Sequence, residues 1–318
     1  MPATSTVVIP TFNRKQMVLG TIRSVYATNW PELEVIVVDD ASTDETGAAI
    51  ALRFPQVRYI RLERNSGPGI ARNTGIHHAS GKWIVLMDDD DLLRPDSLTT
   101  IAEHIAAWPE AEMYPCVQFA HGNGALDQPF RLVRCEDYLQ GRVSGDFVPV
   151  INRILFQKAG LSYPTSGVGG EHLLWLEIAK RYGIPSWNRR VALLGSEPRL
   201  KLCSTANQLA RPREYAELAM RTIGLFGDDI WKTKPRRYWK YAIGAVSYYL
   251  LAADRKAAAS AALSLKRGPG IAILALVASA SLFPTWLLRW LFRAWRYPLT
   301  RTDWRVDHSQ SKREDSGR

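Results

Sequence analysis

Residues 6–107 alternate short apolar runs with segments of helical periodicity, and this alternation constrains the fold more than any other feature. The apolar runs are β-branched and short, as in buried strands, whereas the segments between them repeat apolar residues at helical spacing. Crossovers of this length join parallel strands and place helices on both faces of the sheet. We therefore predict an α/β fold with a Rossmann-like, mostly parallel sheet. The predicted strands are Thr6–Pro10, Glu34–Asp39, Val57–Leu62 and Lys82–Met87, and the predicted helices are Arg14–Ala27, Ser42–Arg53, Pro68–Ala79 and Pro95–Ala107.

Local motifs predict how two of these helices begin. Asn13 precedes the first helix and suits an N-cap, because its side-chain oxygen can accept a hydrogen bond from a free backbone N–H. Ser42 and Glu45 have the spacing of a capping box, which predicts that the second helix begins there.

The pattern is less regular beyond residue 112. Apolar runs predict strands at Met113–Ala120, Phe147–Asn152 and Arg190–Leu194. Helical spacing predicts a helix over Glu171–Tyr182, and the composition is helical from about Arg211 onward.

Composition excludes several classes of protein. The chain has 318 residues, of which 46% are apolar and 23% charged, so a disordered chain is excluded. Three widely spaced cysteines, Cys116, Cys135 and Cys203, form neither a disulfide framework nor a zinc motif. From Trp231 onward, 17 Lys and Arg stand against 5 Asp and Glu, whereas the preceding residues carry 24 against 26. The net charge of +10 therefore belongs to the C-terminal region, which suits an anionic partner there.

Four consecutive carboxylates, Asp88 to Asp91, directly follow the fourth predicted strand. Adjacent anions raise one another's pKa, so a folded site tolerates them best when they share a cation. Oxygen ligands of this kind suit Mg²⁺ or Mn²⁺. The alternative is a solvated acidic turn that caps the following helix.

Two further segments follow strands at the same predicted edge, where ligands of such sheets bind. Asp40 ends the second strand, and could either accept a hydrogen bond from a base or ribose or form an Asx turn. The loop Asn65–Gly69, with Gly67 at its centre, lets backbone approach a ligand closely. It is not a GxGxxG motif, and no phosphate-binding GxxxxGK[ST] motif occurs, so dinucleotide and P-loop functions are weakly supported.

Three segments together resemble the family-2 glycosyltransferases of the GT-A fold: TVVIPTFNR, VIVVDDASTDET and RNSGPGIARNTGIHHASGKWIVLMDDDDLLRPDSL. The resemblance covers about the first hundred residues. It implies a nucleotide-diphospho-sugar donor, a divalent cation (Mn²⁺ or Mg²⁺) and inversion at the anomeric carbon. It also implies a catalytic domain over residues 1–210, with a nucleotide-sugar-binding half (1–112) and an acceptor-side half (113–210), before a helical region over 211–318.

The resemblance also assigns residues to the donor. Pro10, Thr11 and Arg14 match the first nucleotide-contacting loop, and Asp40 matches the aspartate that contacts the base. Arg72 matches a basic residue near the nucleotide and its phosphates.

The Asp-x-Asp motif of the family falls on the acidic run. Asp88 and Asp90 match the acidic pair, with Asp90 as the direct metal ligand. Asp89 is expected to face the ribose, and Asp91 to support the metal or the acceptor.

The family uses a carboxylate as general base at the start of a late helix, and Glu171 matches this position. Gly170 replaces an acidic residue that the family commonly has there, which is a departure. If the register shifts by one, His172 becomes the base. Glu171 could also act only on the helix dipole.

These assignments predict an inverting, metal-dependent transfer of a sugar, most simply from a UDP-sugar, to a hydroxyl of a lipid-linked or surface-polysaccharide acceptor. The alternatives are a polyprenyl-phosphate glycosyltransferase and a non-catalytic, membrane-docked scaffold that keeps the fold.

The C-terminal region has the signature of an interfacial helix. Residues Pro284–Tyr297 mix tryptophans with arginines, a pattern in which aromatic rings lie at headgroup depth and cations face anionic lipid. The uncharged stretch Gly268–Leu288 is diluted by glycine, serine and proline, so an in-plane helix is favoured over a membrane span or a soluble subdomain. We therefore expect a cytoplasmic protein, peripheral on the inner face of the cell membrane, with no nucleic-acid partner.

Other conspicuous residues have simpler interpretations. His77, His78, His104 and His121 are expected on surface or packed helices, because no further ligand stands at metal-binding spacing. Cys116 lies in a strand-like apolar run and is expected in the core. Trp175 is expected to pack the helix that begins near Glu171 against the rest of the domain.

Overall fold

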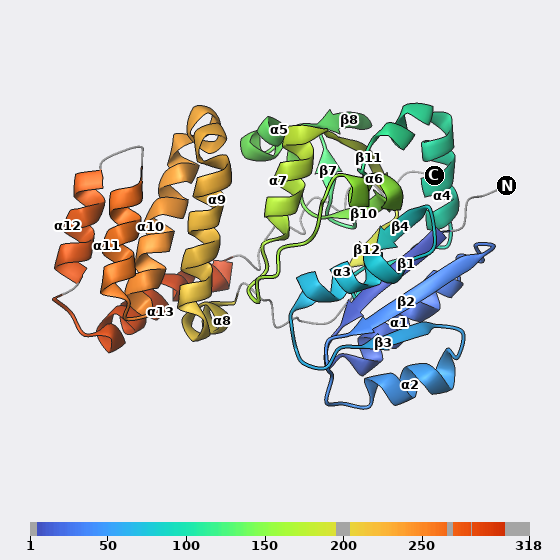
Figure 1. The fold of residues 1–318 in the computed structure, drawn as a ribbon, viewed down its shortest axis with the longest axis horizontal. Coiled ribbons are helices and arrows are strands. Elements are labelled where there is room, and N and C mark those ends of the chain that lie inside the picture. Colours follow the sequence, from blue (N-terminus) through green and yellow to red (C-terminus); the bar gives the residue numbers. More distant parts are fainter. Residues whose placement is uncertain (1–4, 195–203, 266–269, 281, 303–318) are drawn as a thin grey trace, which may run out of the picture. The chain divides into compact units, whose positions relative to one another are not determined.

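The computed structural model describes residues 5–194, 204–265, 270–280 and 282–302 (Figure 1). The chain forms two compact units. The first comprises Met1–Arg199 and Phe226–Pro235, and the second comprises Leu200–Leu225 and Arg236–Arg318. Cys203 and the polar end of the chain, residues 303–318, lie outside the described residues.

An 8-stranded sheet organises the first unit, in the order β3-β2-β1-β4-β10-β6-β11-β8. Strands β3, β2, β1 and β4 run parallel, as the sequence predicts, and β10 enters antiparallel between β4 and β6. Strand β11 is parallel to β6, and β8 is antiparallel to β11. The strands are β1 (Ser5–Thr11), β2 (Leu33–Asp39), β3 (Arg58–Arg61), β4 (Trp83–Leu86), β6 (Cys116–Ala120), β8 (Phe130–Val133), β10 (Phe147–Asn152) and β11 (Ile184–Arg190).

Two small sheets and a set of helices complete this unit. Strand β5 (Asp91–Leu93) pairs with β12 (Ala192–Leu194), and β7 (Ala125–Leu126) pairs with β9 (Val143–Ser144). The helices are α1 (Lys15–Tyr26), α2 (Thr46–Arg53), α3 (Pro68–His78), α4 (Ser97–Ala107), α5 (Cys135–Gln140), α6 (Arg153–Lys158) and α7 (Glu171–Arg181), with a 3-10 turn at Pro109–Met113.

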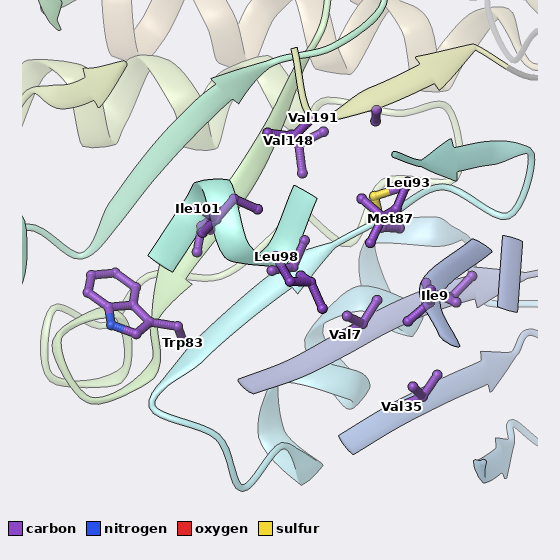
Figure 2. Packing of buried hydrophobic residues seen from close by; sticks show 14 of the residues in the cluster. Val7, Ile9, Val35, Trp83, Met87, Leu93, Leu98, Ile101, Val148 and Val191 are labelled. Atoms are coloured by element: carbon purple, nitrogen blue, oxygen red, sulfur yellow. The ribbon is translucent and has the colours of Figure 1, made fainter. Parts of the chain in front are cut away.

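Alternate side chains of each central strand face opposite helical layers. Val7 and Ile9 of β1 join Val35 of β2 in a core shared with α1 and α4, and Figure 2 shows these side chains together with Leu98 and Ile101 of α4. The intervening residues contribute to a second core, formed with α3, α6 and α7. Helices therefore cover both faces of the sheet, and Cys116 and the partly buried Trp175 belong to the second core as expected.

The second unit is helical. Its elements are α8 (Thr205–Ala210), part of α9 (Pro212–Thr233), α10 (Pro235–Leu251), α11 (Arg255–Ser264), α12 (Gly270–Ala280) and α13 (Thr285–Thr302). Small side chains such as Ala242, Ala245, Ala258 and Ala262 are buried there, which allows helices to pack closely. Among the residues that the structure covers, no helix combines the length and the apolar character needed to cross a bilayer.

Both predicted helix caps are wrong. Helix α1 begins at Lys15, and the Asn13 side chain instead accepts hydrogen bonds from the backbone N–H groups of Thr43 (2.7 Å) and Asp44 (3.4 Å). Ser42 does not cap α2, which begins four residues later; its hydroxyl accepts the N–H of Asn13 at 2.8 Å. These side chains connect the loop after β1 to the loop after β2, so hydrogen bonds between the loops take the place of the predicted helix caps.

The boundaries also differ in the irregular half. Met113 lies in the 3-10 turn, so the strand expected from Met113 begins only at Cys116. The strand expected at Arg190–Leu194 is the short β12, and the longer β11 before it was not predicted. Strand β11 contains Pro185 and polar residues, which obscure the apolar alternation of a strand.

Gly75 lets α3 lie close against the sheet. A Cβ atom at this position would stand 2.2 Å from Val8 Cγ1, inside a fully buried part of β1. Helix α3 also carries Arg72, so the absence of a side chain at Gly75 sets how closely Arg72 approaches the edge of the sheet.

We expect Gly75→Ala to lower the free energy of unfolding by about 1–3 kcal/mol, because the added methyl overpacks a rigid core. Urea denaturation measures the change. Gly20→Ala in α1 is the matched control: its Cβ would meet only Leu92 Cδ2 at 4.0 Å, so the free energy should stay the same or rise by up to about 1 kcal/mol. Equal stability of the two variants would contradict the close approach of α3.

Candidate functional site

The candidate site lies where β1, β2 and β4 end at one edge of the sheet. Thr11, the last residue of β1, pairs in register with Asp39, the last residue of β2. The next residue, Asp40, donates its backbone N–H to Thr11 O at 2.9 Å. Strand β4 ends at Leu86, so the acidic run Asp88–Asp91 leaves the sheet at the same edge. Pro10 is buried within β1, one residue before this edge.

The acidic run forms a tight turn that separates its carboxylates. The Asp91 N–H donates to Asp88 O at 3.2 Å, which closes the turn. Asp89 faces the protein: Thr11 Oγ1 donates to Asp89 Oδ2 at 2.8 Å, and Arg14 Nη1 lies 2.8 Å from Asp89 Oδ1 and 3.1 Å from Asp90 Oδ2. Asp89 therefore anchors the turn to the end of β1 and to the residue before α1.

Burial shifts the acid–base properties of this anchor. Burial raises the pKa of Asp89 above its ordinary value, although Arg14 and the Thr11 hydroxyl oppose the shift. Burial lowers the pKa of Arg14, but the charges of Asp89 and Asp90 outweigh it and raise that pKa overall. Arg14 thus partly compensates for the loss of hydration that the Asp89 carboxylate suffers on burial.

The other three carboxylates of the turn converge. Asp88, Asp90 and Asp91 each offer an oxygen, and these oxygens lie within 4.8 Å of one another. Hard oxygen donors at this spacing suit Mg²⁺ or Mn²⁺, which keep several waters and use few protein carboxylates. The donor set therefore fits the divalent cation expected from the sequence, with Asp91 added to the predicted Asp88 and Asp90.

Arg72 joins this acidic cluster to Glu171. Its Nη2 lies 2.6 Å from Asp88 Oδ1, and its Nη1 lies 3.0 Å from Glu171 Oε1, 99 positions later in the chain. The guanidinium carbon also stands 5.2 Å from the ring centroid of Tyr163. Burial lowers the pKa of Arg72, but the negative charges around it, led by Asp88, outweigh burial and raise it well above its ordinary value.

Two glycines set the position of Glu171. Gly169 and Gly170 have φ angles of 93° and 114°, which residues with a side chain rarely adopt. Helix α7 begins at Glu171 directly after this bend. The departure from the family pattern at Gly170 thus has a structural reason, since an acidic residue would be strained there. His172 follows on the same helix, half-buried, and stays the alternative base.

Asp40 organises the loop that precedes α3. Its two carboxylate oxygens accept the N–H groups of Ser66 and Gly67, both at 2.7 Å. Gly67 has a φ angle of 91°, so glycine suits this bend. A Cβ at Gly69 would lie 2.2 Å from Pro164 O, so this loop lies directly against the segment that leads to Glu171.

A reciprocal pair of hydrogen bonds fixes α3 to the same segment. Asn73 Nδ2 donates to Tyr163 O at 2.9 Å, and the Tyr163 N–H donates to Asn73 Oδ1 at 2.8 Å. Because Asn73 follows Arg72 directly, this pair holds the guanidinium between Asp88 and Glu171.

Sequence reasoning missed two residues at this site. Tyr163, which is fully buried, supports Arg72. His121 was expected on a helix, and that prediction is wrong: it directly follows β6, with its Nε2 3.0 Å from Asp91 Oδ2. Neither residue belongs to a local motif, and only the order of the strands brings them to the acidic cluster. His104 lies on α4, and the exposed His77 and His78 lie on α3, as expected.

The model of the family described as glycosyl transferase family 2 matches residues 6–144 of this chain. That segment contains β1 to β4, the acidic turn and Arg72. The chain contains a family 2 glycosyltransferase domain. The resemblance seen in the sequence is thereby confirmed.

Curated relatives match this chain over different lengths. The succinoglycan biosynthesis protein ExoO of Rhizobium meliloti is 44% identical over 103 residues, which are 32% of this chain and 30% of that protein. The GalNAc(5)-diNAcBac-PP-undecaprenol beta-1,3-glucosyltransferase of Campylobacter jejuni is 25% identical over 265 residues, which are 80% of this chain and 82% of that protein. The first match thus spans under a third of the relative, whereas the second extends beyond the family 2 domain.

Solved structures share the fold. TarS 1–349 of S. aureus, determined in complex with UDP-GlcNAc, gives a TM-score of 0.55 at 16% identity and covers 93% of this chain and 92% of that chain. The mannosyltransferase PcManGT of Pyrobaculum calidifontis, in complex with GDP-Man and Mn²⁺, gives 0.50 at 21% identity and covers 96% and 88%. The chain therefore has the expected GT-A fold, and a helical region from Thr205 follows it.

We expect Arg14→Met to lower the free energy of unfolding by about 2–3 kcal/mol at pH 7. Removing one partner of a buried ion pair costs about 3–5 kcal/mol, and the partial exposure of Arg14 reduces that figure. Since the pKa of Asp89 is already raised, the ionised carboxylate destabilises the fold above that pKa, and the loss should shrink as pH falls toward the ordinary value of 3.8.

Chemical denaturation of both proteins across this pH range measures the loss. Lys15→Met is the control: its partner Glu45 is exposed, so the change should be small and screened by salt. A pH-independent loss in Arg14→Met would contradict the anchoring role of Asp89.

Proposed function

We propose that this protein transfers a sugar from a nucleotide-diphospho-sugar to an acceptor hydroxyl, with inversion at the anomeric carbon. The observation that carries the proposal is the placement of Arg72 between Asp88 of the acidic turn and Glu171 of α7. A donor-binding group and a carboxylate base must lie side by side for such a reaction, and one guanidinium contacts both.

The donor would occupy the edge of the sheet. Pro10, Thr11, Arg14, Asp40 and Gly67 would surround the nucleotide, as the family resemblance implies. Arg72 would contact the phosphates, with Asp88 beside the diphosphate. Asp89, which the resemblance places at the ribose, is buried against Thr11 and Arg14 and would serve the donor by holding the turn. A UDP-sugar is the donor that we propose, and the complex of TarS with UDP-GlcNAc supports it.

Asp88 and Asp90 would hold a Mn²⁺ or Mg²⁺ ion, with Asp91 close enough to join them. When bound, such an ion offsets the negative charge that builds up on a departing diphosphate. The Mn²⁺-bound complex of PcManGT supports a divalent cation at this fold's site. The protein's own part is to keep these carboxylates converged, which the contacts of Arg14 and Arg72 do.

Glu171 would act as the general base. Its carboxylate would take the proton of the acceptor hydroxyl as that oxygen attacks the sugar from the face opposite the diphosphate. A direct attack of this kind inverts the configuration and needs no covalent enzyme intermediate. Arg72 would orient the carboxylate through the contact at 3.0 Å.

The acceptor that we propose is lipid-linked or belongs to a surface polysaccharide. The name of the Campylobacter relative ends in -PP-undecaprenol, and the Rhizobium relative is named for succinoglycan biosynthesis. The first name supports a lipid-linked acceptor, and the second supports a polysaccharide.

We expect Glu171→Gln to lower the turnover of sugar transfer by about 10²–10⁴-fold while donor binding changes little, because an amide cannot take the proton. Product formation from a UDP-sugar and donor affinity by calorimetry measure the two effects. Glu177→Gln on the exposed side of α7 is the matched control and should leave both unchanged.

The same assay decides between the two candidate bases. If His172→Gln, rather than Glu171→Gln, abolished transfer, the register would be shifted by one and Glu171 would only hold Arg72. Full transfer by Glu171→Gln would remove it from the mechanism.

Helix α13 would place the enzyme on the inner face of an anionic membrane. Trp286 and Trp290, four positions apart, are 69% and 60% exposed, and Leu291 is 47% exposed. The helix contains arginines and no acidic residue. Exposed tryptophans beside arginines are typical of a helix that lies in the lipid headgroup region.

We expect the wild-type protein to sediment with vesicles of phosphatidylglycerol and phosphatidylcholine, and the double variant Trp286→Ser/Trp290→Ser to bind at least about tenfold more weakly. Burying a large apolar side chain contributes about 1.5–3 kcal/mol, so losing two should be measurable. Leu263→Ser, at an exposed site on α11, is the control and should not change binding. Complete release of the wild type by salt alone would contradict insertion of the tryptophans.

A further inference from the structure

His121 is buried beside the acidic turn, although nothing in the sequence connects the two. The residue is 3% exposed and directly follows β6. Its backbone is held on both sides: the His121 N–H donates to Asp146 O, and the N–H of Gly124 donates to His121 O, both at 3.0 Å. A Cβ at Gly124 would lie 2.1 Å from Asp146 O, so this turn has no room for a side chain at that position.

The imidazole of His121 meets the last carboxylate of the turn. Nε2 lies 3.0 Å from Asp91 Oδ2, and the two side chains are 4% and 10% exposed. Neither ring nitrogen makes a well-aligned hydrogen bond within the described part of the chain. Burying a polar group in that state is unfavourable, so apolar packing alone does not account for a histidine here.

The strands bring these two side chains together. Asp91 begins β5 and pairs in register with Leu194 of β12. The N–H of Val191, just before β12, donates to Ala120 O, next to His121, at 3.1 Å. The segment at Val191 therefore links the end of β6 to the acidic turn, which fixes the spacing of His121 and Asp91.

His121 completes a pattern of basic partners around the turn. Arg14 contacts Asp89 and Asp90, and Arg72 contacts Asp88. His121 lies against Asp91, the last carboxylate of the turn. Each of the four carboxylates thus has a nitrogen-bearing side chain within ion-pair distance.

We propose that His121 is a positioning residue of the acidic cluster, holding the Asp91 carboxylate so that an oxygen faces those of Asp88 and Asp90. The cluster could then bind a divalent cation with three preset oxygens instead of two. This inference rests on the cation of the proposed function. His121 itself lies outside the group of three converging carboxylates, so it acts through Asp91.

The test is the affinity of the donor-free protein for Mn²⁺, measured by calorimetry and by electron paramagnetic resonance of the free ion. His121→Leu should weaken binding by about 10–100-fold, the usual effect of removing a residue that orients a metal ligand. His121→Gln can place an amide nitrogen near the position of Nε2 and should recover most of the affinity, whereas His121→Asn, which is shorter, should not. His104→Gln, at a histidine whose Nδ1 lies 2.8 Å from Thr100 O in α4, is the control and should bind as the wild type does.

A double-variant cycle separates positioning from a general loss of structure. If His121 acts through Asp91, adding His121→Leu to Asp91→Asn should weaken Mn²⁺ binding no further than Asp91→Asn alone. Additive losses, or an unchanged affinity in folded His121→Leu, would overturn the proposal. If His121→Leu does not fold, the comparison of the Gln and Asn variants decides, and equal affinities of these two would overturn it. A wild type that binds no Mn²⁺ would overturn the cation of the proposed function as well, which is a distinct result.

Discussion

The ion pairs of Arg72 are the interaction on which the candidate site depends. One guanidinium, at 2.6 Å from Asp88 and 3.0 Å from Glu171, joins an N-terminal sheet edge to a helix far along the chain. Its position follows from several close contacts: Gly75 lets α3 approach the sheet, and Asn73 binds the backbone of Tyr163. Packing at the buried side of α3 therefore sets the distance between the acidic turn and the proposed base.

Much of the first hundred residues could be predicted from the sequence. The central strands are fully buried and apolar, so their limits show directly in runs such as Val7–Ile9, and the parallel order follows from the crossover helices. The acidic turn is also predictable, because adjacent carboxylates repel one another and a folded site tolerates them best when they share a cation. Residue identity alone was sufficient for both inferences.

The remainder depends on contacts between distant segments. Asn13 and Ser42 have the side chains of helix caps. Each instead accepts a backbone N–H from the other's loop, and these contacts provide partners for N–H groups in both loops. Strand β11 contains polar residues and a proline, so its sequence lacks the apolar alternation by which a strand is predicted. Tyr163 and His121 lie in segments without a motif. They reach the acidic cluster through contacts between distant segments, such as the insertion of the antiparallel strand β10 beside β4 and the pairing of β5 with β12.

The arrangement of charge at the sheet edge has a consequence for the order of events. The carboxylates of Asp88, Asp89, Asp90 and Glu171 lie against the guanidinium groups of Arg14 and Arg72, and Asp91 lies against His121, so these carboxylates outnumber the two arginines. These carboxylates would repel a bare diphosphate, and charges at a protein surface act over about 8–10 Å at physiological ionic strength. If the proposed function holds, a donor whose diphosphate charge a divalent cation already offsets would meet less repulsion here than the free nucleotide, so the surface charge itself would favour the cation-bound form of the donor.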